Sequence, residues 1–373
     1  MRQGRQGDEG TGELAQRHRA SAQGSALTSA VPAEASGQIP SVRLLVQWHI
    51  TDRCPRRCRH CYIPDHSHEP RLDRLLAILD RWIALDRQAR ALVGDVWRLD
   101  FNLTGGEFLS HPDWREFLER LRTVLPASRV ALLLSGELLT DSVADELASR
   151  ALRYVQFSLD GGRKEHEEIR GPGSFETVLS AIRRMSRRGV EVVVSHTAFP
   201  GRSGALADAA KAARDAGARS IWTDRVVPGP GHSGWDADTT QAYLDELAEC
   251  SKNMSRGTFR MRTSRALQFL SCGGEPYTCA AGDGLLSVLA DGTMVPCRRL
   301  PIPLATLPDD DPFEAWRSHP VVTSLRTRAP DGCQLCLFRN SCRGGAPCLT
   351  FAQTDNALLT DAACPAPSWV RHG

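Results

Sequence analysis

Six short apolar runs alternate with amphipathic stretches, and this alternation restricts the possible fold more than any other feature of the sequence. The apolar runs cover residues 42–50, 96–103, 129–135, 154–159, 190–197 and 220–227. The stretches with helical spacing of apolar residues include 71–85, 113–125, 141–151, 174–189 and 205–217. Strands that alternate with helices favour parallel βα units joined by right-handed crossovers. We therefore predict an α/β fold, a partial (β/α)6 barrel of the TIM type.

The predicted helices carry end signals. Asp113, Asp141 and Ser174 open three of them, and these residue types are typical N-caps. Gly189 closes the helix that Ser174 opens, and Gly217 closes the helix over 205–217, as glycine commonly does. The helices are therefore expected to begin and end at these residues.

The rest of the chain divides by composition. Residues 1–40 are rich in Gly, Ala, Ser, Gln and Arg without apolar periodicity, which predicts a disordered tail. We expect the barrel over 41–235, a helical linker over 236–271 and a small cysteine-rich domain over 272–373. The net charge of +2 does not favour nucleic-acid binding. The sequence has neither a long apolar run nor the apolar core of a signal peptide, so a cytoplasmic protein without membrane contact is expected.

In a reducing compartment, the 12 cysteines indicate metal binding more than disulfides. Three of them, Cys54, Cys58 and Cys61, lie in "CPRRCRHCY", residues 54–62, which we call the cysteine loop. A structural zinc site needs four ligands. A four-iron cubane held by three thiolates keeps one iron open to a substrate or cofactor. A zinc knuckle or a redox thiol cluster is the alternative.

Further motifs follow the predicted strands. "TGGE" (104–107) follows the second strand, "SGE" (135–137) follows the third, and "SLDGG" (158–162) closes the fourth. The cysteine loop follows the first. Because function gathers at the carboxyl ends of barrel strands, these motifs are expected to form one site.

The C-x3-C-x2-C spacing followed by an aromatic residue resembles the signature of the radical S-adenosylmethionine (radical SAM) superfamily. The resemblance implies that the methionyl group of S-adenosylmethionine chelates the open iron and that a 5′-deoxyadenosyl radical forms. It also implies a flavodoxin- or ferredoxin-type reductant.

The same resemblance suggests residues that bind the cofactor. The "GGE" motif would receive the amino group of the cofactor, polar residues at the fourth strand end would face it, and an arginine would pair with its carboxylate. These positions are Gly105, Gly106, Glu107, Ser158, Asp160 and Arg170. The alternative for Arg170 is an ordinary surface residue.

Eight cysteines fall between Cys272 and Cys364, among them Cys333-x2-Cys336-x5-Cys342, and the last of these three begins "CRGG". This pattern in the last hundred residues resembles the SPASM extension of radical SAM enzymes, which implies two auxiliary clusters and three [4Fe-4S] clusters in total. One set of ligands would be Cys272, Cys279, Cys297 and Cys348, and the other Cys333, Cys336, Cys342 and Cys364. The sequence departs from the family pattern in the five residues between Cys342 and Cys348, where three are commoner. A zinc ribbon is the alternative for the triplet that begins at Cys333.

The resemblance favours an oxidoreductase that cross-links or dehydrogenates a ribosomally synthesised peptide. The alternatives are a radical dehydrogenase or epimerase acting on a small sugar-like or aminoglycoside-like molecule, and a scaffold with degenerate clusters. Sulfatase maturation is disfavoured, because Arg298 and Arg299 follow Cys297 where enzymes of that type have an acidic residue. Cys250 remains outside the three clusters; we expect it to pack in the core, and the alternative is a hydrogen donor of an epimerase.

Overall fold

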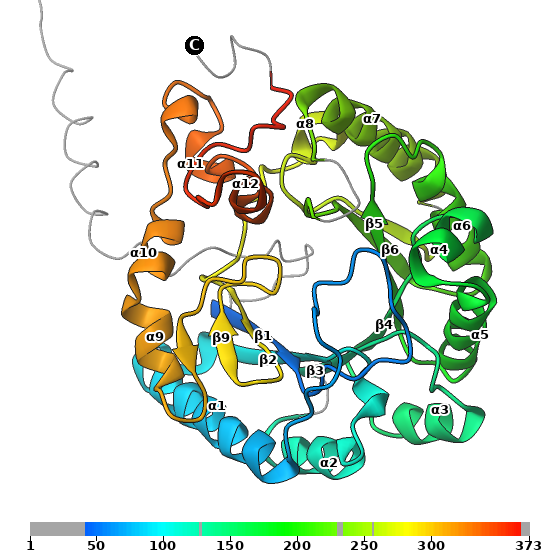
Figure 1. The fold of residues 1–373 in the computed structure, drawn as a ribbon, viewed down its shortest axis with the longest axis vertical. Coiled ribbons are helices and arrows are strands. Elements are labelled where there is room, and N and C mark those ends of the chain that lie inside the picture. Colours follow the sequence, from blue (N-terminus) through cyan, green and yellow to red (C-terminus); the bar gives the residue numbers. More distant parts are fainter. Residues whose placement is uncertain (1–41, 127–128, 230–233, 256, 367–373) are drawn as a thin grey trace, which may run out of the picture.

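A computed structural model describes residues 42–126, 129–229, 234–255 and 257–366 (Figure 1). The predicted tail therefore lies outside the described residues. Within the described ranges, no helix is both long and apolar enough to cross a membrane.

All six predicted strands are present and parallel. They pair in the order in which they occur in the chain, so each βα unit lies beside the next. Their bounds are β1(Val42–His49), β2(Trp97–Thr104), β3(Val130–Leu134), β4(Tyr154–Ser158), β5(Val192–Ala198) and β6(Ser220–Arg225). The α/β barrel class is thereby confirmed.

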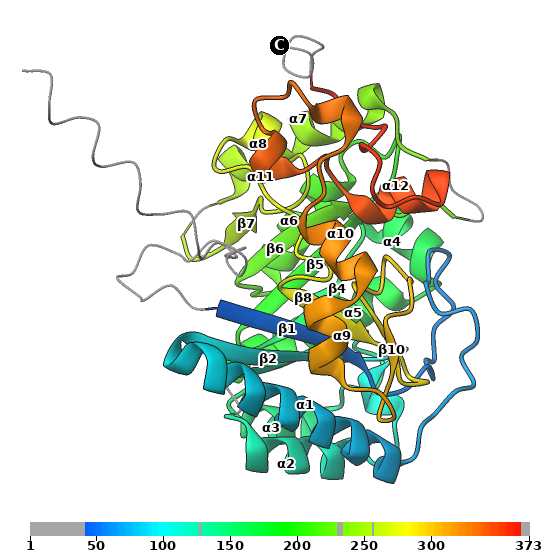
Figure 2. The same ribbon diagram turned by 90° about the vertical axis from the view of Figure 1, so that its left-hand side faces the viewer.

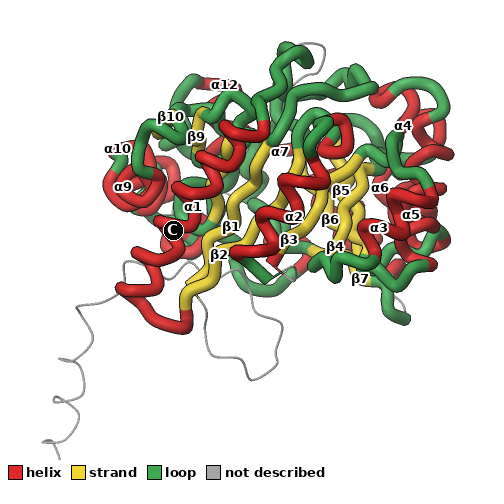
Figure 3. Tube along the Cα trace, turned by 90° about the horizontal axis from the view of Figure 1, so that it is seen from below, coloured by secondary structure: helices red, strands yellow, loops and turns green. Residues whose placement is uncertain are grey.

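The predicted helices are also present and cover the outside of the strands (Figure 3). They are α1(Leu72–Val93), α2(Trp114–Val124), α3(Asp141–Ala148), α5(Ser174–Arg187) and α6(Ala205–Asp215). Two further helices are α4(Arg163–Arg170), which the sequence analysis missed, and α7(Ala237–Met254) in the predicted linker. Short 3-10 turns cover Gly94–Val96, Phe108–Ser110 and Asp331–Cys333. Helix α1 continues past the predicted end at residue 85, because apolar residues still recur at helical spacing there.

The predicted N-caps were partly wrong. Asp141 is the first residue inside α3, and the cap is Thr140, whose hydroxyl accepts from the Val143 N–H at 3.2 Å. Ser174 likewise lies inside α5 after Gly173. An Asp or Ser inside the first turn resembles a cap in sequence, so only the backbone geometry separates the two positions.

The two predicted C-terminal glycines behave as expected. Gly189 has φ +74° and Gly217 has φ +97°, and both follow the ends of α5 and α6. This left-handed backbone costs glycine little, which makes it a favourable helix terminator.

The sheet extends beyond the six predicted strands at both edges. β7(Arg260–Arg262) lies parallel to β6, and β8(Leu285–Val288) lies parallel to β1. β9(Thr293–Val295) and β10(Ala305–Thr306) complete that edge as antiparallel strands. The cysteine-rich segment therefore continues the sheet of the barrel.

Short helices complete the cysteine-rich segment. They are α8(Phe269–Cys272), α9(Pro312–Ser318), α10(Pro320–Arg326), α11(Arg339–Cys342) and α12(Pro347–Thr354). Figures 1 and 2 show α9 to α12 in a column along one side of the molecule. The predicted domain boundary at residue 272 stays a prediction.

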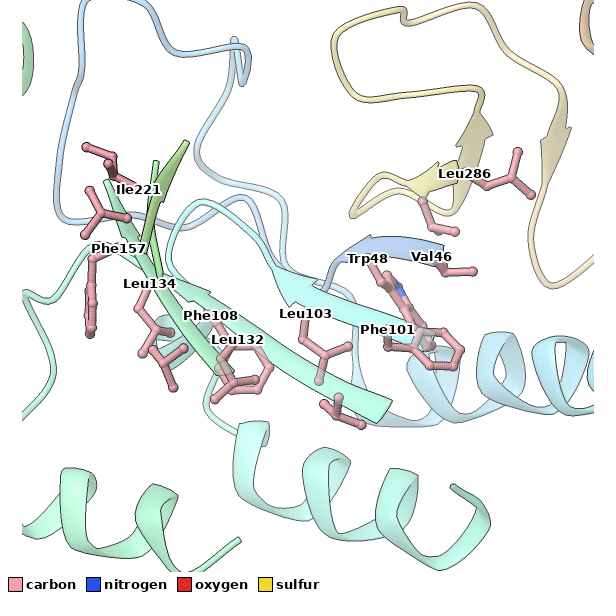
Figure 4. Packing of buried hydrophobic residues seen from close by; sticks show 14 of the residues in the cluster. Val46, Trp48, Phe101, Leu103, Phe108, Leu132, Leu134, Phe157, Ile221 and Leu286 are labelled. Carbon is pink, nitrogen blue, oxygen red and sulfur yellow. The ribbon is translucent and has the colours of Figure 1, made fainter. Parts of the chain in front are cut away.

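Side chains alternate between the two faces of the barrel strands. Trp48, Phe101 and Phe157 are buried on the face toward the helices (Figure 4), and the Trp48 ring meets Phe117 of α2 edge-on at 5.0 Å. The next residue along a strand faces the other way. His49 at the end of β1 therefore points into the barrel, where it is buried as well. The barrel interior thus offers polar groups where a site can form.

Candidate active site

A cavity lies at the carboxyl ends of β1 to β4, and we call it the mouth cavity. The segments that follow all four strands line it, as the positions of the motifs predicted. Its lining includes Cys54, Cys58, Cys61, Gly105, Gly106, Ser135, Glu137, Ser158 and Arg170. The structure thus brings most of the predicted cofactor-binding residues together with the three loop thiols.

The thiols of the cysteine loop are free, with Cys54 and Cys58 half-buried and Cys61 exposed. Burial raises the pKa of Cys54 to about 11 and also raises the pKa of Cys58. Both groups are therefore neutral thiols near pH 7 in the cluster-free chain. Because iron binds the thiolate, assembly of a cluster here must displace these protons.

Arg56 anchors the cysteine loop to its neighbours, a role that the sequence analysis missed. Its Nε donates to Glu137 Oε1 at 2.6 Å, and its Nη1 donates to the Pro172 carbonyl at 3.1 Å. The Arg59 N–H donates to the Ile169 carbonyl at 2.9 Å. The loop is therefore held by the segments after β3 and β4. The signal in the sequence was Glu137, an acidic residue placed directly after a strand.

Gly105 and Gly106 pack against the chain segment that leads into the cysteine loop. A Cβ at Gly105 would lie 2.4 Å from the Thr51 carbonyl oxygen, and one at Gly106 would lie 2.4 Å from that of Asp52. The Gly106 N–H also donates to the Thr51 carbonyl at 2.7 Å. The close approach that requires glycine here is thus made by the backbone of the protein itself. It fixes the base of the cysteine loop beside the end of β2.

Glu107 is buried and directed toward the segment after β3. Its carboxylate accepts from the backbone N–H of Ser135 at 2.6 Å, from the Ser135 hydroxyl and from the Leu109 N–H at 3.2 Å. Burial raises the pKa of Glu107, although these hydrogen bonds oppose the shift. The carboxylate therefore already has protein partners, and a cofactor amino group would have to share them.

Asp160 and Arg170 form an ion pair beside the cysteine loop. Arg170 Nε lies 2.6 Å from Asp160 Oδ2, and Arg170 Nη1 lies 3.9 Å from Cys58 Sγ. The Arg170 side chain is only 17% exposed, so the surface alternative was wrong. Burial alone would raise the pKa of Asp160, but the charge of Arg170 outweighs it and holds this pKa well below its usual range. Both groups therefore remain charged beside the thiols.

The remaining predicted polar position is Ser158 at the end of β4. Its hydroxyl lies 3.1 Å from that of Ser195 on β5, and the side chain lines the mouth cavity. It can therefore offer a hydrogen bond to a molecule in the cavity.

The mouth cavity is also lined by residues that the sequence analysis did not place in the site, among them His49, His166 and Arg298. Burial, followed by the charge of Arg298, lowers the pKa of His49 to about 3. Burial lowers the pKa of His166 to about 4. Both imidazoles are therefore neutral at pH 7. His49 could have been found as the last polar residue of the first strand, whereas nothing near Arg298 in the sequence places it here.

The C-terminal cysteines fall into groups. One cavity in the cysteine-rich segment, lined by thiols from separate turns, contains the complete second predicted ligand set, Cys333, Cys336, Cys342 and Cys364. These residues could hold an auxiliary cluster.

The thiols of the first predicted auxiliary set lie in buried or partly buried surroundings. Burial raises the pKa of Cys348 to about 12, and the nearby charges of Cys279 and Cys297 act in the same direction. Cys272, at the end of α8, has its pKa raised to about 11 by burial. In the described ranges, no three His, Cys, Asp or Glu side chains converge on a single metal ion.

Cys250 lies on α7 and is buried within the hydrophobic core. Burial raises the pKa of its thiol to about 11. This is the environment of a packing residue.

A parallel partial barrel with three loop thiols in a cavity at its strand ends has the architecture of an iron–sulfur enzyme. Residues 48–213 match the family model of the radical SAM superfamily, and the cysteine-rich segment follows the matched residues. This match implies S-adenosylmethionine and a [4Fe-4S] cluster as cofactors.

Known proteins resemble most of the chain. PqqA peptide cyclase of Streptomyces rochei is 28% identical over 84% of this chain and 87% of its own length. The structure of anSMEcpe with bound AdoMet and Cp18Cys peptide has a TM-score of 0.68 at 17% identity, covering 86% of this chain and 93% of that one. Streptococcus suis SuiB bound to precursor peptide SuiA has a TM-score of 0.66 at 14% identity, covering 87% of this chain and 76% of that one. At these identities the two structures establish the likeness of fold.

Proposed function

We propose that the protein is a radical SAM oxidoreductase that cross-links or dehydrogenates a ribosomally synthesised peptide. The observation that carries the proposal is the mouth cavity, in which the thiols of the cysteine loop lie beside the ends of β2, β3 and β4. The likeness to PqqA peptide cyclase along most of the chain supports a peptide as the substrate.

In this proposal the cysteine loop holds the cluster at the mouth of the barrel through Cys54, Cys58 and Cys61. When bound, the cluster and S-adenosylmethionine supply a 5′-deoxyadenosyl radical. Arg170 lies against Cys58 and presents a fixed fork of donors, which suits the carboxylate of the cofactor. Asp160 keeps that fork in place through its ion pair.

The other assignments in the cavity follow from position. Ser158 offers a hydroxyl to the cofactor from the end of β4. The close packing of Gly105 and Gly106 against the backbone before the cysteine loop fixes the position of that loop relative to β2. Glu107 accepts a hydrogen bond from the N–H of Ser135, which lines the mouth cavity, and it is the candidate partner of the cofactor amino group.

The cysteine-rich segment, residues 272–373, would hold two auxiliary clusters and form a unit separate in function from the barrel of 41–235, joined by 236–271. The two ligand sets are those named from the sequence. When bound, these clusters would take up the second electron of a net oxidation. A flavodoxin- or ferredoxin-type reductant would supply the electron that the cluster of the cysteine loop needs. The C-terminal cavity lined by four thiols supports the second set.

The experiment is anaerobic incubation of the reconstituted enzyme with S-adenosylmethionine, a reductant and a short peptide encoded beside its gene. We expect 5′-deoxyadenosine to form and the peptide to lose two hydrogen atoms, as measured by mass spectrometry. Fragmentation of the product distinguishes a cross-link from a double bond. Cofactor cleavage that leaves every such peptide unchanged, together with turnover of a sugar-like molecule, would contradict the proposal.

A further inference from the structure

Arg298 connects the cysteine-rich segment to the mouth cavity. It follows Cys297, shortly after β9, and its side chain is part of the cavity lining. The guanidinium carbon lies 5.7 Å from the centre of the ring of Tyr62, the last residue of the cysteine loop. A cation from the C-terminal third of the chain therefore faces the place where the cofactor is proposed to bind.

The other arginines of the cavity wall have carboxylate partners. Arg56 pairs with Glu137, and Arg170 pairs with Asp160. For Arg298, no carboxylate of the described residues lies within ion-pair distance. A partly buried charge is unfavourable unless it is paired, so this guanidinium is poised for a carboxylate that the described residues do not supply.

The adjacent arginine shows the contrast. Arg299 forms an ion pair with Asp224 of β6 and donates to the Arg225 carbonyl. It therefore ties the cysteine-rich segment to the barrel. Two consecutive arginines have different surroundings, because one faces a carboxylate on a strand and the other faces the cavity.

The groups around Arg298 leave room for an anionic ligand. His49 is buried at the end of β1, and its Nε2 lacks a hydrogen-bond partner among the described residues. Since this imidazole is neutral, it neither neutralises Arg298 nor repels an anion. It can add one hydrogen bond to a group that the guanidinium attracts.

We propose that Arg298 binds a carboxylate of the peptide substrate and thereby selects which residue faces the radical. This inference rests on the proposed function and names the chemistry that the site selects. A planar guanidinium binds a carboxylate through two parallel hydrogen bonds, which fixes orientation as well as position. The carboxylate belongs either to an acidic side chain or to the C-terminus of the peptide.

The test measures peptide binding rather than turnover. Reconstituted enzyme with S-adenosylmethionine is mixed with two pools of random short peptides, one with free and one with amidated C-termini, and the retained peptides are sequenced by mass spectrometry. The variants are Arg298→Gln, Arg298→Lys and, as a matched control, Arg187→Gln on the exposed face of α5. Iron content and cofactor affinity are measured for each.

We expect the wild type and Arg187→Gln to enrich carboxylate-bearing peptides roughly 10- to 100-fold, the range for charge-assisted hydrogen bonds. Arg298→Gln should lose this enrichment while retaining its iron and its affinity for S-adenosylmethionine, and Arg298→Lys should keep part of it. Stronger retention of the free pool than of the amidated pool assigns the C-terminus, and enrichment of peptides with Asp or Glu in both pools assigns a side chain.

Equal enrichment by Arg298→Gln and the wild type would overturn the inference and leave the proposed function intact. Weaker cofactor binding by Arg298→Gln would also overturn it, because the guanidinium would then serve the cofactor. If Arg298→Gln takes up no iron, Arg298→Lys is compared with the wild type instead. A weaker enrichment of carboxylate-bearing peptides by the lysine variant supports the inference, and an equal enrichment overturns it. A wild type that retains no peptide from either pool overturns the proposed function and this inference together.

Discussion

The ion pair between Arg225 and Asp361 is expected to hold the cysteine-rich segment on the barrel. Arg225 ends β6, and Asp361 lies three residues before Cys364. The two side chains are 1% and 0% exposed, and Arg225 Nη2 lies 2.5 Å from Asp361 Oδ2. The same carboxylate accepts from the N–H groups of Ala346 and Ala363, both at 3.1 Å.

Asp361→Asn removes the charge but retains the shape and an oxygen for one of the backbone donors. The charge of Arg225 then remains buried without compensation, and breaking such a pair costs about 3–5 kcal/mol. Because Asp361 also orders the turns around Cys342 and Cys364, the variant should take up less iron in the second auxiliary set. The matched control is Asp215→Ala, which removes an exposed i,i+4 pair with Lys211 on α6 and should cost about 0.3–0.5 kcal/mol.

The assay is urea unfolding of each full-length variant, monitored by tryptophan fluorescence. The double variant Arg225→Met with Asp361→Leu should recover most of the loss, since it leaves no buried charge unpaired. If Asp361→Asn loses no more free energy of unfolding than Asp215→Ala, or if the double variant is as unstable as the single one, the reasoning is refuted.

Three other predictions concern clusters, packing and pH. Anaerobic reconstitution should yield about twelve irons per chain, and replacing all three cysteines of the cysteine loop with alanine should remove about four and abolish cofactor cleavage; 5′-deoxyadenosine from that triple variant would show the loop to be misassigned. Cys250→Ala should lower the free energy of unfolding by about 1–2 kcal/mol and leave the product unchanged; deuterium from D2O in the wild-type product, absent with the variant, would make Cys250 the hydrogen donor. Burial lowers the pKa of His49 from 6.5 to about 3, so the unfolded chain binds the extra proton between these values and stability should fall as pH drops through this range. In His49→Gln the decline measured by urea unfolding should be shallower by up to about 1.4 kcal/mol per pH unit, and an unchanged slope would contradict the assigned environment.

The strands and helices of the barrel could be predicted because their signals are local. The alternation of apolar runs with helical stretches is encoded by neighbouring residues, and each of the six runs forms its strand. The positions of the cysteine loop and of "TGGE" after β1 and β2 follow from the same reasoning. Parallel strands place their carboxyl ends at one edge, so motifs far apart in the chain could be expected to meet.

The exact ends of the helices, and helix α4 as a whole, were harder to predict from the sequence. Helix α4 carries a single apolar residue, Ile169, and is bounded by glycines, so no recurring apolar positions mark it in the sequence. It nevertheless places Arg170 beside Cys58. Only the packed structure shows that this arginine is buried and paired with Asp160 rather than exposed.

The sequence by itself determined the parallel barrel, the three-thiol loop and the motifs at the strand ends, because periodicity and spacing depend on neighbouring residues. The tertiary structure alone decided which arginine side chains form ion pairs with carboxylates. Arg298 and Arg299 are adjacent in the chain, yet Arg299 meets Asp224 and Arg298 meets the mouth cavity. Both arginines reach the barrel because β8 pairs with β1, which joins segments more than two hundred residues apart. Such a contact depends on the packing of whole elements, so no local pattern encodes it.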